Sequence, residues 1–252
     1  LSHNMDWNRK LILEDGQEYY GYAFGSRESA VCEMVFNTSM VGYQEILSDP
    51  SYAYQAVVMT YPLIGNYGMA PEDYEAGAPA MGALIVREYN PEPSNFRSAA
   101  PLGKVMKNHN IPGISGIDTR KLTRSIRDFG SRKVLITDAD TPLEAGLAAL
   151  RCAELPTDAV SRVSCREIRT FSAQTPKHHV VAIDCGMKKN IVRSLIRRDC
   201  TVTAVPWNTP WEAIAAQNPD GIFISNGPGD PADVPQTIET VRNLIGRYPI
   251  FG

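Results

Sequence analysis

The alternation of apolar runs and helical segments after residue 179 constrains the fold of this chain most. Short apolar runs stand at 180–184, 201–206, 221–225 and 248–252. Apolar residues at helical spacing fill the intervals between them, at 188–199, 210–217 and 235–246. Strands and helices alternating in this way form a parallel sheet with right-handed crossovers. The sequence therefore predicts a doubly wound α/β domain over 179–252, with its ligand at the carboxyl ends of the strands.

The preceding part of the chain, residues 5–150, is predicted to be one β-rich mixed α/β domain. We expect strands at 11–16, 19–24, 31–37, 56–62, 82–88 and 132–138. We expect helices at 40–50, 104–110, 118–130 and 142–151. Residues 151–178 between the two domains have no apolar periodicity, and we interpret them as a linker.

Local signals fix the ends of several of these elements. An Asp15-Gly16 turn predicts that the first two strands form a hairpin. Pro50 is expected to end the first helix. The helix at 118–130 is predicted to begin after Asp118 as N-cap and to end at Gly130, with Leu122, Ile126 and Phe129 on one face.

Composition excludes several classes of function. The chain has 252 residues, 43% hydrophobic and 21% charged, with a formal net charge of -3, which predicts no nucleic-acid partner. Its apolar runs are too short to span a membrane. Its five cysteines are odd in number and form no C-x-x-C pair, which argues against disulfides and zinc and for a reducing, cytoplasmic location. No phosphate-binding G-x-x-x-x-G-K-[ST] motif is present, so we expect no ATP site.

The sequence NGPGDP at 226–231 follows the third apolar run of the second domain. Glycine permits positive φ and lets a ligand approach the backbone, and the prolines remove competing donors. The amides of Gly227 and Gly229 could then face one ligand oxygen and form an oxyanion hole. A rigid turn that binds nothing explains the same residues equally well.

Several segments together resemble one family. SNGPGDP at 225–231 and AIDCGMKKNI at 182–191 are similar to the start of a class I glutamine amidotransferase domain, and the loop resembles that of carbamoyl phosphate synthetase small subunits. Four further segments resemble the amino-terminal domain of those subunits: FNTSMVGYQEILSDPSY at 36–52, TYPLIGNYG at 60–68, SNFR at 94–97 and GIDTRKLTR at 116–124. The resemblance covers nearly all of 10–252 and is weakest at 152–178.

The resemblance implies a glutaminase subunit of a ligase. Small subunits of this family hydrolyse glutamine and pass ammonia through a tunnel to a large subunit. The large subunit makes carbamoyl phosphate from it with bicarbonate and ATP, for arginine or pyrimidine synthesis. The implied fold joins a β-rich amino-terminal domain to a flavodoxin-like amidotransferase domain. ATP and magnesium belong to the large subunit, so no cofactor is expected in this chain, and the number of assembled heterodimers stays open.

The resemblance also assigns roles to residues of this chain. Gly227 and Gly229 would contact glutamine, with the Gly227 amide as one half of the oxyanion hole. Ser51 would reach the same substrate, although a turn residue after Pro50 is its alternative explanation. Four residues of the helix at 118–130 are candidates for subunit contact, or else form a solvated face: Asp118, Arg120, Lys121 and Arg124.

The family's nucleophile does not appear in this sequence. It is a cysteine in a Gly-Ile-Cys-x-Gly-His run after the fourth strand, and here it would lie two residues beyond Gly252, with the family's His and Glu further downstream. We therefore expect a truncated amidotransferase domain with an uncovered apolar edge, and no glutamine hydrolysis by this chain alone. A non-catalytic scaffold for an ammonia-dependent synthetase is the alternative. A different amidotransferase, of the anthranilate or GMP synthetase type, would leave 36–124 unexplained.

Overall fold

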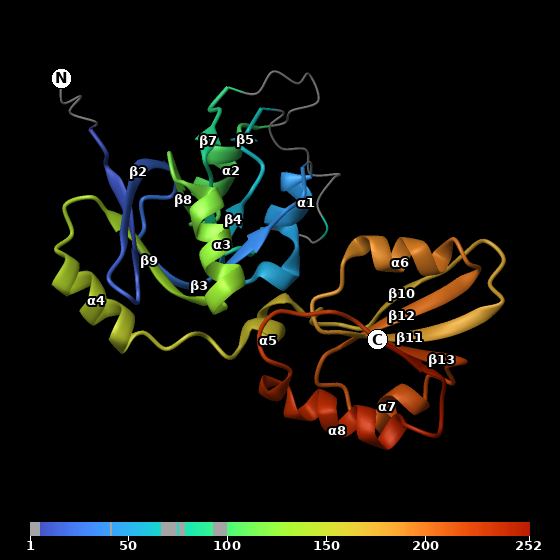
Figure 1. The fold of residues 1–252 in the computed structure, drawn as a ribbon. Helices are drawn as coiled ribbons and strands as arrows, with labels where there is room; N and C mark the ends of the chain where they lie inside the picture. Colours follow the sequence, from blue (N-terminus) through green and yellow to red (C-terminus); the bar gives the residue numbers. More distant parts are fainter. Residues whose placement is uncertain (1–5, 41, 67–74, 76–78, 93–99) are drawn as a thin grey trace. The chain divides into compact units, whose positions relative to one another are not determined.

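The chain divides into two compact units. The computed structural model describes residues 6–40, 42–66, 75, 79–92 and 100–252. The first unit takes the chain up to Ser48 and again from Tyr54 to Leu155. The second unit takes Asp49–Ala53 and Pro156–Gly252 (Figure 1). The five residues from Asp49 to Ala53 thus belong to the second unit, although both of their chain neighbours belong to the first.

The first unit contains a closed barrel in the strand order β1-β2-β8-β6-β4-β3-β9. Its strands are β1 Arg9–Leu13, β2 Glu18–Gly25, β3 Ala30–Asn37, β4 Gln55–Met59, β6 Ala83–Ile85, β8 Pro112–Ser115 and β9 Arg132–Asp138. The pairs β3-β4, β4-β6 and β6-β8 are parallel, and the other pairs are antiparallel. A separate parallel pair is formed by β5 Leu63–Ile64 and β7 Glu88–Tyr89. The hairpin predicted at the Asp15-Gly16 turn is confirmed.

The barrel has an apolar core to which every one of its strands contributes. Its fully or almost fully buried side chains include Leu11, Leu13, Met34, Val58, Ile85, Ile114, Val134 and Ile136. The residues alternate along each strand because successive side chains point to opposite faces. Closure leaves none of these seven strands with an unpaired edge.

The described part of the first unit also holds four α-helices. They are α1 Tyr43–Ser48, α2 Leu102–Asn108, α3 Thr119–Phe129 and α4 Leu143–Cys152. Helix α3 begins as predicted, because the Asp118 carboxylate accepts a hydrogen bond from the Lys121 amide at 3.0 Å. Of the residues predicted to share one face, Leu122 and Ile126 are buried in the barrel core, whereas Phe129 is exposed. Apolar periodicity shows which side chains share one face of a helix, but it does not show how far along the helix that face is covered. The exposed Phe129 ring, in the last turn of α3, lies beside Arg132.

The second unit is built on an open five-stranded sheet in the order β10-β12-β11-β13-β14. Its strands are β10 Arg169–Phe171, β11 His178–Asp184, β12 Cys200–Pro206, β13 Gly221–Ile224 and β14 Ile250–Phe251. The last four are parallel to one another, as predicted. Strand β10 pairs antiparallel with β12 and lies within the segment interpreted as a linker. That segment also holds the short helix α5 Ala159–Val163, so it contains regular structure that the sequence did not predict.

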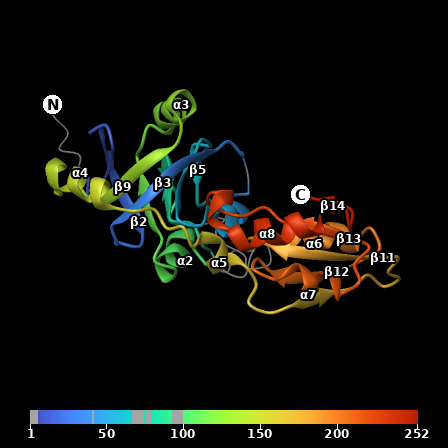
Figure 2. The same cartoon turned by 90° about the horizontal axis from the view of Figure 1, so that it is seen from below.

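Helices cover both faces of this sheet. Helix α6 Lys189–Ile196 packs on one face, where Val192 meets Ala182 and Val202. Helices α7 Trp211–Ala215 and α8 Pro235–Leu244 pack on the other (Figures 1 and 2). A short 3-10 helix, η3 Pro231–Asp233, precedes α8. This arrangement is the doubly wound parallel sheet that the alternation predicts, and it places the 226–231 loop at the carboxyl end of β13.

Two features are absent from the described part of the chain. No helix there has the length and apolar character to cross a bilayer. Nor does that part bring three or more His, Cys, Asp or Glu side chains together as metal ligands.

Candidate functional site

The 226–231 loop is held against the turn that follows the neighbouring strand β11. The register of β11 and β13 pairs Ile183 with Ile224, so both strands end side by side. Ser225 links the two ends, because its hydroxyl accepts a hydrogen bond from the Cys185 amide at 2.9 Å and donates one to the Asn226 carbonyl at 2.8 Å. The loop is therefore fixed to the sheet through a buried serine.

The two glycines of the loop are required for different reasons. A Cβ on Gly227 would lie 2.3 Å from the Cys185 carbonyl oxygen, so only glycine lets the two backbones approach so closely. Gly229 has φ +80°, a conformation that favours glycine. Among the described residues, neither amide has a hydrogen-bond partner, and both glycines are exposed. The loop thus has two backbone N–H groups that could donate to a ligand, and their contact with a ligand stays a prediction.

Asp184, which sequence reasoning did not single out, shapes the turn at 185–187. One oxygen of its buried carboxylate accepts hydrogen bonds from the amides of Gly186 at 2.9 Å and Met187 at 2.7 Å. The other oxygen accepts one from the Cys165 amide at 2.9 Å. An Asp at a strand end before a glycine is a turn signal, so the sequence did contain a clue to this role.

Ser51 lies beside the 226–231 loop, within the second unit. The Asn226 side-chain amide donates a hydrogen bond to the Ser51 hydroxyl at 2.6 Å. Ser51 belongs to the 3-10 helix η1 Pro50–Tyr52, whose N-cap is Asp49. Pro50 therefore follows α1, as predicted, but it also opens this second helix, since proline suits a first helical position. The structure thus joins Ser51 to the loop that carries the two glycines, and their shared role in one site stays a prediction.

A salt bridge also fixes the 49–53 segment. The Lys188 ammonium lies 2.7 Å from the Asp49 carboxylate, whose side chain is only 9% exposed. The second Asp49 oxygen accepts a hydrogen bond from the Ser51 amide at 2.9 Å. Lys188 directly follows the 185–187 turn, and Asn226 belongs to the 226–231 loop. Both this turn and this loop therefore bond to the 49–53 segment.

A cavity of about 440 Å³ adjoins the loop. That volume falls within the range of roughly 300–1,000 Å³ common for small-molecule sites. Besides loop residues, its lining comprises Val160, Cys185, Ile224, Ser225, Val234, Thr237, Ile238, Val241 and Arg242. The wall is mainly apolar, with polar backbone groups at the loop, as is common in small-molecule sites.

Cys185 is the cysteine nearest to this loop, but it is not an activated nucleophile. Burial raises the pKa of its thiol to about 11, and a hydrogen bond with Thr237 offsets only part of that effect. Attack on an amide requires the thiolate, which such a pKa suppresses at neutral pH. Burial likewise raises the pKa values of Cys32 and Cys165 to about 12. These three thiols are therefore unsuited to act as the nucleophile.

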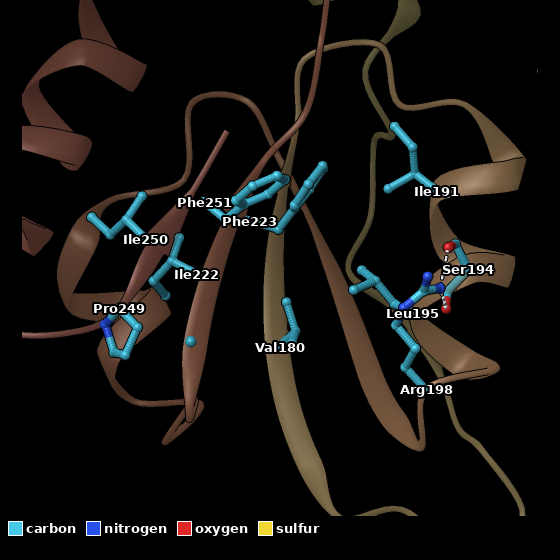
Figure 3. A pocket seen from close by; sticks show the side chains of 11 residues that line it. Val180, Ile191, Ser194, Leu195, Arg198, Ile222, Phe223, Pro249, Ile250 and Phe251 are labelled. Atoms are coloured by element: carbon cyan, nitrogen blue, oxygen red, sulfur yellow. Dashed lines mark hydrogen bonds between the residues drawn. The ribbon is translucent and has the colours of Figure 1, made fainter.

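A second and larger hollow, of about 580 Å³, lies elsewhere in the same unit. Figure 3 shows it lined mainly by apolar side chains of β11, β13, β14 and α6, with Phe223 and Phe251 side by side. The two rings are stacked with their centroids 5.9 Å apart. None of the predicted site residues lines this hollow, so we place the candidate site at the 226–231 loop.

The four candidate interface residues belong to the first unit, whereas the 226–231 loop belongs to the second. Three of them lie on α3, and Asp118 is its N-cap. All four are exposed. Asp118 caps the helix, and the Lys121 ammonium lies 5.1 Å from the centre of the Tyr19 ring. Their part in subunit contact stays a prediction. The SNFR segment at 94–97, which carried some of the resemblance, lies outside the described residues.

Comparison with known proteins gives matches over both units. The family model "Carbamoyl-phosphate synthase small chain, CPSase domain" matches residues 11–136, and "Glutamine amidotransferase class-I" matches 181–252. The chain is 49% identical over 244 residues to the carbamoyl phosphate synthase small chain of Oceanobacillus iheyensis, covering 97% of this chain and 66% of that protein. It is 48% identical to the pyrimidine-specific small chain of Bacillus subtilis (strain 168), with the same coverage. The chain thus spans about two thirds of the length of these curated relatives.

Proposed function

This chain belongs to the carbamoyl-phosphate synthase small chain family, and from that premise we propose that the whole protein is the glutamine-hydrolysing subunit of a carbamoyl phosphate synthase. It would release ammonia for a large subunit that makes carbamoyl phosphate from bicarbonate and ATP. The observation that carries the proposal is the pair of available Gly227 and Gly229 amides beside the Ser51 hydroxyl. This arrangement suits an amide substrate that must be held at several polar atoms.

The loop would act on the side-chain amide of glutamine. A thiolate adds to the amide carbon, and the carbonyl oxygen becomes an oxyanion that accepts a hydrogen bond from the Gly227 amide. The carbon–nitrogen bond then breaks, ammonia leaves after the nitrogen gains a proton, and water hydrolyses the thioester to glutamate. The attacking cysteine would come from elsewhere in the whole protein, as the resemblance implies, and the Cys185 thiol, whose pKa burial raises to about 11, does not suit that role.

The fold and the partners of the whole protein form part of the same proposal. The parallel sheet of the second unit supports a flavodoxin-like amidotransferase domain, to which further elements of the whole protein would add. The name shared by its relatives supports a large subunit as partner. ATP and magnesium would bind that partner, while this chain would bind glutamine and no cofactor.

Glutamine hydrolysis by this chain and by the whole protein provides the test. The 252-residue chain should release no glutamate above a blank, whereas the whole protein with a large subunit should release glutamate and support carbamoyl phosphate synthesis from glutamine. The raised pKa of Cys185 also fits a second candidate, a scaffold subunit for a synthase that uses free ammonia. Synthesis from ammonia but not from glutamine by the whole complex would favour that candidate and contradict the first.

A further inference from the structure

Asn226 faces two groups whose chemistry fixes how its side chain is oriented. Its amide nitrogen lies 2.6 Å from the Ser51 hydroxyl oxygen and 3.4 Å from the Gly186 carbonyl oxygen. A carbonyl oxygen can only accept a hydrogen bond, so the donor end of the amide must face Gly186. The same NH₂ group then donates to Ser51.

This orientation determines what the Ser51 hydroxyl can do. Its oxygen accepts the hydrogen bond from Asn226, so its own proton points to another acceptor. No acceptor for that proton is found among the described residues. The hydroxyl is thus presented as a donor at the loop that carries the Gly227 and Gly229 amides.

The backbone of Ser51 is fixed separately from its hydroxyl. Asp49 accepts a hydrogen bond from the Ser51 amide through one oxygen and pairs with Lys188 through the other. Asp49 is 7% exposed, so solvent screens this pair less than it would a surface pair. Ser51 is held from the 185–187 turn through Lys188 and from the 226–231 loop through Asn226.

We propose that Asn226 is a positioning residue that orients the Ser51 hydroxyl as a hydrogen-bond donor toward a carboxylate or carbonyl oxygen of bound glutamine. The Asp49–Lys188 pair keeps the 49–53 segment in place for this contact. The inference rests on the proposed glutamine site and adds to it the direction of one hydrogen bond.

The experiment measures the affinity of the 252-residue chain for L-glutamine by calorimetry, and the hydrogen exchange of the Ser51 amide by NMR. Ser51→Ala and Asn226→Ala should each weaken binding about ten-fold, and the double variant should be no weaker than either one. Asn226→Asp is the sharper variant, because its carboxylate can still bond to Ser51 but only as an acceptor. It should keep the Ser51 amide protected and still lose about ten-fold in affinity. Asn243→Ala, whose side chain bonds only to Glu239 on α8, is the matched control and should bind as the unaltered chain does.

The outcomes separate this inference from the proposed function. If the unaltered chain binds L-glutamine and Asn226→Asp binds it equally well, the direction of the hydrogen bond is wrong. If the losses of the two single variants multiply to about a hundred-fold in the double variant, Asn226 acts independently of Ser51 and the positioning role is wrong. If the unaltered chain does not bind L-glutamine, the proposed site itself fails, and the inference falls with it.

Discussion

The barrel of the first unit and the open sheet of the second differ in what their strands do: the barrel strands enclose a core, and the sheet strands carry loops at their ends. Each barrel strand has a neighbour on both sides, and the apolar side chains of all seven strands meet in one core. The sheet is open, with edges at β10 and β14, strands of three and two residues. Closure favours stability, whereas the open parallel sheet leaves its strand ends available to carry loops. The candidate site accordingly belongs to the sheet.

The barrel should respond most strongly to the loss of a core side chain. Met34→Ala removes a fully buried side chain from the barrel core and should lower the free energy of unfolding by about 3 kcal/mol. Urea denaturation followed by circular dichroism measures the change. Met40→Ala is the matched control: Met40 is 71% exposed, and its loss should change stability by no more than about 0.5 kcal/mol. Similar losses for both variants would contradict the view of the barrel as the more tightly packed region.

In the open sheet, the strongest structural constraint should lie at the loop rather than in a strand. Gly227→Ala places a methyl group against the Cys185 carbonyl and should lower the free energy of unfolding by about 2 kcal/mol. Gly221→Ala in β13 is its control, since the nearest atom to that Cβ, the Pro249 carbonyl oxygen, is 3.5 Å away. Equal free energies of unfolding for the two variants, measured by chemical denaturation, would contradict the close approach of the Gly227 and Cys185 backbones.

Buried thiols should make both units less stable at high pH. The pKa is raised by burial to about 12 for Cys32 in the barrel and to about 11 for Cys185 beside the loop, from a usual value of 9.0. The unfolded thiols ionise first, so the contribution of each is complete below pH 9 and is lost as the pH rises toward 11 and 12. The loss should reach about 1 kcal/mol per thiol at pH 10. The free energy of unfolding of Cys32→Ala and Cys185→Ala, measured by denaturation between pH 8 and 10, should depend less on pH than that of the unaltered chain. The same pH dependence in the variants and the unaltered chain would contradict this account.

The smallest effect is expected at the exposed edge of the sheet. Phe251→Ser removes a ring that is 73% exposed and stacks on Phe223, and it should cost about 0.5 kcal/mol. Its side chain is larger than that of Met34, so the pair of variants separates the effect of burial from that of size. A loss as large as that of Met34→Ala, in the same denaturation experiment, would show that β14 is packed far better than its exposure indicates.

The sequence predicted the open sheet better than the barrel. In the second unit strands and helices alternate along the chain, and the sheet forms from neighbouring segments. Local apolar periodicity was therefore enough to predict this sheet. Six of the seven barrel strands were also predicted one by one, but β8 was not, and it pairs between β2 and β6, while β9 joins β1 to β3. Those pairings join distant segments, and local patterns do not encode them. Strand β10 was missed because all three of its residues are exposed and it has no apolar face.

The candidate site was predicted only in part. Glycines and prolines after a strand marked the 226–231 loop, because they indicate unusual backbone. Ser51 came from the resemblance alone, since nothing local to it indicates a neighbour far along the chain. Asn226, Asp184 and Lys188 were not identified as supporting residues. Their contacts depend on how two loops and the 49–53 segment meet, which only the structure shows.

The most direct test of the central claim is a titration of the ¹⁵N-labelled chain with L-glutamine, followed by NMR of its backbone amides. The account predicts saturable shifts of the Gly227, Gly229 and Ser51 amide signals. The signal of Gly130, which ends α3 in the first unit, should not move. Unchanged signals for Gly227 and Gly229 up to a saturating concentration would contradict the assignment of the 226–231 loop as a glutamine site.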